Sequence, residues 1–228
     1  MSLGENMKKK DYYIYKMDIS YLNVVSIVLL FGLLIFNQYV VKYNLFNKIL
    51  EINNLFDLLF LYFIYTVIHE LLHSFSYVLN GAKFKKVIFG VMLEKGILYC
   101  LCKQNISKKN ILCSLLTPFF VIGVFTYIIG VYFDIPLLVM LSILNISGCS
   151  GDLVMFSFIS RLKNIEFTEF DDATSFALYS SKDLSKYKHK GLKYVGKRDS
   201  VLRKDMKKIV ISRVSLAIIL FMFVLLFF

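Results

Sequence analysis

The sequence predicts an all-α membrane protein with about five transmembrane helices and a short interfacial β-hairpin after the second. Three observations predict this class. Of the 228 residues, 57% are hydrophobic and only 19% are charged, whereas about a quarter of the residues in soluble domains are charged. Apolar runs of about twenty residues, the length that a helix needs to cross a bilayer, recur along the chain. The basic residues, which bring the net charge to +11, lie in blocks between these runs.

Four of the predicted spans, together with the hairpin, would form a membrane core over residues 1–160. A basic segment at 161–208 follows this core, and a last apolar run at 209–228 ends the chain as a fifth span, AIILFMFVLLFF. The four spans of the core are expected at about 21–41, 54–80, 109–132 and 135–160.

The lysines and arginines predict the orientation of these spans. With five spans, the basic N-terminal tail, the 81–108 connection and the 161–208 segment all lie on one side of the membrane. Because basic loops stay inside, we expect the chain in the cell membrane with a cytoplasmic N-terminus and an external C-terminus. The basic blocks also predict contact between the 161–208 segment and anionic lipids, and they do not favour nucleic acid as a partner.

The connection at 83–104 predicts a β-hairpin. It holds two short apolar runs, KKVIFGVML and GILYCLC, which are rich in residues that favour strands. A Glu-Lys-Gly turn at 94–96 separates them. The runs are too short to cross a bilayer as helices, so we expect the hairpin to lie at the membrane interface.

The second predicted span carries the motif HELLH at 69–73. On a helix, His69 and His73 project from one face and can bind a single metal ion, for which Zn²⁺ is the natural choice. Glu70 is placed to take a proton from a metal-bound water. Chance occurrence is the alternative, but ionisable side chains inside a membrane span are costly, so they indicate a functional site.

A third metal ligand is expected from another span. His189 lies in the basic stretch KYKHKG and is interpreted as a surface residue. Asp152 is the remaining buried acid; like His69, it lies about fifteen to seventeen residues from the outer end of its span and so at a similar depth. The alternative interpretation is that Asp152 lies at a helix end and its carboxylate accepts hydrogen bonds from backbone N–H groups. Asn145, two turns earlier, is a candidate for substrate positioning or second-shell support, or for simple interhelical hydrogen bonding.

Three sequence pieces carry a resemblance to a known family: HELLH at 69–73, LTPFF at 116–120 and SGCSGDLVM at 147–155. The chain resembles the DUF3267 family of zincin peptidases, which are similar to site-2 proteases. The resemblance implies Zn²⁺ bound by His69, His73 and Asp152, with Glu70 as the general base. It also implies that the hairpin would hold an unwound substrate as an added strand. The chain lacks the Asn-x-x-Pro of site-2 proteases, and no Gly follows Asp152, so substrate positioning would differ.

The expected function is therefore that of a zinc-dependent intramembrane peptidase, a metalloprotease that hydrolyses a membrane protein or peptide with metal-activated water. The alternative is a non-catalytic metal-binding membrane protein or an ion transporter. Many transporters carry internal repeats, and this sequence shows none. Neither the peptidase nor its alternative predicts an oligomeric state.

Overall fold

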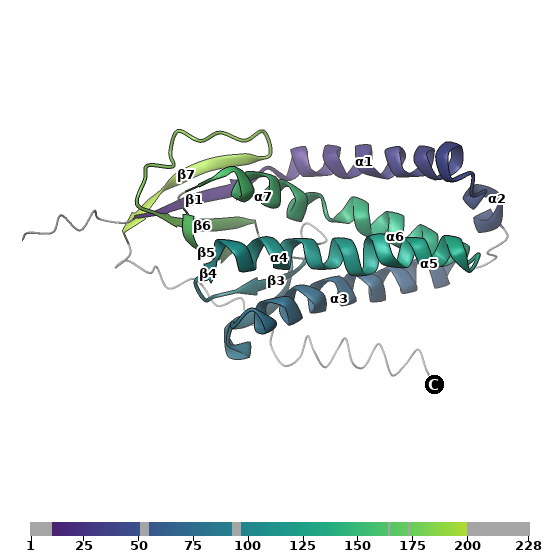
Figure 1. Cartoon of the computed structure of the whole chain (residues 1–228), viewed down its shortest axis with the longest axis horizontal. Helices are drawn as coiled ribbons and strands as arrows, with labels where there is room; N and C mark the ends of the chain where they lie inside the picture. The colour runs from purple at the N-terminus through teal and green to yellow at the C-terminus, as the bar shows by residue number, and fades with distance from the viewer. Residues whose placement is uncertain (1–10, 51–54, 93–96, 164, 173, 200–228) are drawn as a thin grey trace, which may run out of the picture.

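A sheet lies at one end of a bundle of long helices (Figure 1). The computed structural model describes residues 11–50, 55–92, 97–163, 165–172 and 174–199. The helical elements are α1 Ile19–Phe36, η1 Asn37–Val41, α2 Leu45–Leu50, α3 Leu55–Leu79, η2 Phe84–Lys86, α4 Lys108–Pro118, η4 Phe119–Phe125, α5 Thr126–Tyr132, α6 Pro136–Gly148 and α7 Ser150–Arg161. The strands are β1 Asp11–Met17, β2 Val87–Met92, β3 Ile97–Cys102, β4 Ile106–Ser107, β5 Ile165–Asp172, β6 Ser175–Ser180 and β7 Leu192–Asp199.

The long helices fall on the predicted apolar runs. Among the described residues, Ile19–Val41, Leu58–Leu79 and Lys108–Tyr132 are long and apolar enough to cross a membrane. The bent pair of α6 and α7 makes a fourth if it counts as one span. These helices are those of a multi-pass membrane protein. The predicted fifth span, 209–228, lies outside the described residues, and the orientation of the chain stays a prediction.

The outer face of α1 is apolar and exposed. Val24, Val28 and Phe31 are 58%, 65% and 60% exposed. Soluble monomers rarely present a continuous apolar surface of this kind, because water disfavours it. Within a bilayer the same side chains would contact lipid tails, so the exposed face agrees with a membrane-crossing role for α1.

A five-stranded antiparallel sheet, with strand order β4-β5-β6-β1-β7, was not predicted. The all-α class is therefore incomplete: the described chain is mostly helical, with this sheet and the β2–β3 hairpin in addition. Strands β5, β6 and β7 lie in the segment that the sequence analysis treated only as basic. The boundary proposed at residue 160 stays a prediction.

Strand β1, at the start of the described chain, pairs with strands from its last part. It pairs antiparallel with β6 on one side and with β7 on the other. Tyr13 and Tyr15 alternate along it and are buried, as a strand with one covered face requires. The ring of Phe158 in α7 lies 4.8 Å from that of Tyr15, so α7 packs on this sheet. The strand ends at Met17, and the Asp18 side chain caps α1 directly after it.

The predicted hairpin at 83–104 forms as β2 and β3, paired antiparallel with Phe89 opposite Cys100. Gly90 is needed here because the Tyr99 ring covers it: a Cβ on Gly90 would lie 2.1 Å from Tyr99 Cζ. The predicted turn at 94–96 lies outside the described residues. The interfacial position of the hairpin stays a prediction.

Two of the apolar runs are not regular helices. After Pro118, the third run widens into the π-helix η4 before it continues as α5. The fourth run, predicted as a single span over 135–160, breaks at Cys149 into α6 and α7, which are bent by 46°. Kinks and π-turns of this kind have local causes and often occur at functional sites.

The packing of α5 against α6 gives a first prediction. A Cβ on Gly130 would lie 2.9 Å from the backbone nitrogen of Val139 and 2.9 Å from its Cγ2. The Gly130→Ala variant should therefore lose about 1–3 kcal/mol of stability through overpacking. Thermal unfolding of the purified chain in detergent would measure the loss as a lowered Tm.

Gly32→Ala on α1 is the matched control, because nothing lies within 4 Å of the Cβ that it would add. This variant should keep or slightly raise the Tm, since alanine favours a helix over glycine by about 1 kcal/mol. Equal melting of the two variants would contradict the described contact between α5 and α6.

Candidate metal centre

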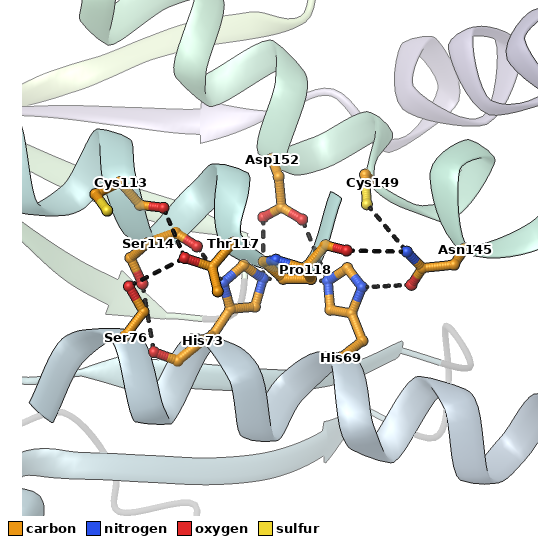
Figure 2. Close-up of polar contacts among 10 residues, drawn as sticks. All are labelled: His69, His73, Ser76, Cys113, Ser114, Thr117, Pro118, Asn145, Cys149 and Asp152. Carbon is orange, nitrogen blue, oxygen red and sulfur yellow. Dashed lines mark hydrogen bonds and ion pairs between the residues drawn. The ribbon is translucent and has the colours of Figure 1, made fainter. Parts of the chain in front are cut away.

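Side chains from two helices far apart in the sequence meet inside the bundle (Figure 2). His69 and His73 lie one turn apart on α3, and Asp152 lies in the first turn of α7. Their side chains are 12%, 6% and 18% exposed. Nε2 of His69 lies 3.3 Å from Asp152 Oδ2, and Nε2 of His73 lies 3.4 Å from Oδ1. The two Nε2 atoms are 3.1 Å apart.

The opposite nitrogen of each imidazole faces a fixed hydrogen-bond acceptor. Nδ1 of His69 lies 2.9 Å from Oδ1 of Asn145, and Nδ1 of His73 lies 3.0 Å from the carbonyl oxygen of Ser114. Because each acceptor requires a donor, both neutral rings carry their proton on Nδ1. Both Nε2 atoms are then left with lone pairs that point at each other and at a carboxylate.

The Ser114 carbonyl is available for His73 because of Pro118. In a helix this oxygen would accept the backbone N–H four residues later, at Pro118, and proline has none. The imidazole takes that place with its own N–H. In return, the Ser114 hydroxyl donates to the carbonyl oxygen of His73 at 3.3 Å. A proline inside an apolar span thus supplies the support for one histidine.

Asn145 is held in the orientation that His69 needs. Its Nδ2 donates to the carbonyl oxygen of Pro118 at 3.3 Å, so its Oδ1 is turned toward His69. Gly123 of η4 allows α6 to approach at this level, since a Cβ there would lie 2.8 Å from Ile146 Cγ1. The amide therefore connects α3, η4 and α6 at the level of the site.

The break between α6 and α7 determines where the Asp152 carboxylate lies. It makes the residues after Cys149 the start of a new helix, with Asp152 in its first turn. The free N–H groups and the dipole at a helix start stabilise a negative charge. The bend thus directs a carboxylate at α3 and stabilises its ionised form.

The geometry of these donor atoms fits a zinc ion. Ligand atoms about 2.0–2.1 Å from a tetrahedral zinc ion lie about 3.3 Å from one another. The two Nε2 atoms are 3.1 Å apart, and each lies 3.3 or 3.4 Å from one of the two Asp152 oxygens, which is close to that spacing. Two neutral imidazoles and a carboxylate are typical zinc ligands, and each histidine has the outer hydrogen bond that zinc-bound histidines almost always make. The residues present fit the metal.

A cavity of about 190 Å³ adjoins the site. It is large enough for several water molecules. The half-buried Glu70 faces it from α3, next to His69 and close to Cys100 of β3. The cavity is lined by Tyr62, Tyr65, Thr66, His69, Glu70, Leu98, Leu144, Asn145 and Gly148.

The structure brings together all five of the residues singled out from the sequence. His69, His73 and Asp152 converge, Asn145 contacts His69, and Glu70 lines the adjoining cavity. His189 is elsewhere: it follows β6, and its Nδ1 accepts the backbone N–H of Gly191.

Three residues near the site were not selected from the sequence. Ser114 and Pro118 support the histidines as described, and a proline inside an apolar run was the signal that could have pointed to them. Cys149 is fully buried. Its Sγ belongs, with His69 and Asp152, to a group whose ligand atoms all lie within 4.8 Å of one another.

Membrane-length helices that enclose a His-His-Asp cluster define a class: multi-pass membrane proteins with a metal-type centre inside the bundle. Residues 62–166 match the model of the DUF3267 family, described as "Putative zincin peptidase". The resemblance to this family is thereby confirmed over the part of the chain that holds the site. The zincin description implies zinc. No curated protein and no solved structure matches the sequence.

The contact between Asn145 and His69 gives a second prediction. Asn145→Ala removes the acceptor that fixes the His69 ring, so we expect zinc affinity to fall about 10–100-fold, as for other outer hydrogen-bond partners of zinc ligands. Competition with a fluorescent chelator would measure it on the purified chain.

Asn110→Ala is the control for this prediction. It removes the same amide from α4, where Nδ2 of Asn110 donates to the carbonyl oxygen of Asn80 at 2.8 Å. Its zinc affinity should match that of wild type. Equal affinities for the two variants would show that Asn145 does not support the site.

Proposed function

We propose that the chain is a zinc-dependent intramembrane peptidase, which hydrolyses peptide bonds in or near the membrane with metal-activated water. The observation that carries this proposal is the meeting of two imidazole lone pairs and a carboxylate, within 3.4 Å of each other, beside a cavity lined by Glu70. The zincin description of the family supports the same chemistry.

The proposed roles follow from the positions of the side chains. His69, His73 and Asp152 would hold the zinc ion, which supplies Lewis-acid activation of water and of a carbonyl oxygen. Glu70 would accept the proton of the attacking water and return it to the leaving amine. Asn145 would keep the His69 ring oriented during this cycle.

The substrate would enter beside the hairpin. Leu98 of β3 lines the cavity, and Glu70 lies close to Cys100 of the same strand. A peptide that extends along β3 would bring its own backbone next to Glu70, whereas a helical segment has its amides bonded internally. We therefore propose a membrane protein or peptide that unwinds locally as the substrate.

The rival proposal is a membrane protein that binds or transports a metal ion without catalysis. It uses the same ligands but gives Glu70 no chemical task. A variant that keeps the ligands and removes the base distinguishes the two proposals.

Glu70→Gln is that variant. We expect it to bind as much zinc as wild type and to lose about 10²–10⁴-fold in turnover, because the amide cannot accept the proton. Cleavage of β-casein by the purified chain in detergent would be followed on gels, with zinc measured by mass spectrometry on the same samples.

Asp134→Asn is the control, since it makes the same change in an exposed carboxylate that pairs with Lys48 at the opposite end of the bundle. It should cleave like wild type. Full activity in Glu70→Gln would eliminate Glu70 as the base, and zinc binding without any cleavage by wild type would favour the rival proposal.

We propose anionic lipid as a second partner, at the loop between β6 and β7. Its four lysines, at 182, 186, 188 and 190, are exposed. The loop ends at Gly191, which packs against Tyr21 in the first turn of α1. These lysines therefore lie close to one end of α1. Because α1 belongs to a helix long enough to cross a membrane, lipid headgroups are expected near that end.

Replacing the four loop lysines with glutamine should reduce the retention of phosphatidylglycerol relative to phosphatidylcholine. Each lysine near an anionic surface contributes about 1 kcal/mol, and salt screens this attraction. Lipid retained by the purified chain would be measured by mass spectrometry at low and high salt. Equal retention by wild type and the variant would contradict the proposal.

A further inference from the structure

Cys149 lies where the fourth membrane-length segment breaks. It ends α6 and precedes α7, with φ −68° and ψ 9°, and its side chain is fully buried. Its Sγ lies within 4.8 Å of the ligand atoms of both His69 and Asp152. Figure 2 shows the thiol on the same side of the site as Asn145, whose Nδ2 is 3.9 Å from Sγ.

The surroundings of this thiol differ from those of an ordinary buried cysteine. Buried cysteines usually behave as small apolar side chains among other apolar groups. Cys149 instead faces an amide, an imidazole and a carboxylate. Thiolate sulfur is one of the three common zinc ligands, with a bond of about 2.3 Å.

The ligand count at the site leaves room for this sulfur. Two histidines and one aspartate fill three of the four positions of a tetrahedral zinc ion, and catalytic sites keep the fourth for water. A sulfur that reached that position would close the site.

We propose that Cys149 is the fourth ligand of the metal centre in a resting, closed state. This inference rests on the proposed metal centre and adds a control element to it. When the sulfur binds, the metal–sulfur bond forms and the thiol proton passes to water in the adjoining cavity. When the sulfur leaves, the thiolate takes a proton back and water occupies its position. Turnover therefore requires displacement of Cys149.

Cobalt is the probe for this proposal, because Co²⁺ replaces zinc and reports its ligands by colour. The full chain, purified in detergent and loaded with Co²⁺, should show visible ligand-field bands from the metal centre. It should also show a near-ultraviolet charge-transfer band, which arises only from sulfur bound to cobalt. We expect the charge-transfer band to disappear in Cys149→Ser while the visible bands remain.

Cys113→Ser is the matched control, because this thiol lies on α4 and is exposed. It should keep both sets of bands. Visible bands without charge transfer in wild type, or charge transfer that persists in Cys149→Ser, would overturn the inference and leave the metal centre standing. Absence of cobalt binding in wild type would overturn both.

A measurement on wild type alone covers the case in which Cys149→Ser does not fold. X-ray absorption at the zinc edge should detect one sulfur neighbour at about 2.3 Å beside the lighter nitrogen and oxygen neighbours. A first shell without sulfur would overturn the inference.

Discussion

Both histidines of the site donate their Nδ1–H to acceptors on other helices, so in the neutral rings the Nε2 lone pairs face a carboxylate. Two nitrogen lone pairs and a carboxylate this close repel one another, and the low dielectric constant of a buried site strengthens the repulsion. A cation between the atoms would remove the repulsion. In the proposed metal centre, α3 and α7 would supply the ligands around this positive charge, and Asn145 of α6 would hold one of them in place.

The support for this arrangement comes from defects in otherwise regular helices. Pro118 leaves the Ser114 carbonyl open to an imidazole, and its own carbonyl holds the amide of Asn145. The break at Cys149 starts a new helix whose first turn carries Asp152. A membrane interior offers no water to satisfy a disrupted backbone, so such defects persist only where side chains occupy the freed groups. Around Pro118, His73 and Asn145 do so.

Much of the helical part of the fold could be predicted from the sequence, because an apolar run of membrane length forms few structures other than a membrane-crossing helix. The residues of the site could be selected because ionisable side chains are energetically unfavourable in such runs and therefore indicate a function. The five-stranded sheet was missed because β1 lies next to a long apolar run and pairs only with strands more than 150 residues away. Its alternating Tyr13 and Tyr15 were the available signal, and the basic residues around β7 obscured a similar pattern. The glycines in GCSGD, at 148 and 151, indicate that a helix could break there, but the apolar run around them favoured a single span.

The central position of β1 has a consequence for the order in which the molecule is completed. Among the described elements this strand is translated first, whereas its neighbours β6 and β7 are translated last. Contacts of such long sequence separation form slowly. Because α7 rests on the sheet through Phe158 and Tyr15, the helix that carries Asp152 gains its complete platform only after β6 and β7 have been translated. A nascent chain that ends before β6 would thus hold the two histidines of α3 without the platform for the helix that carries Asp152.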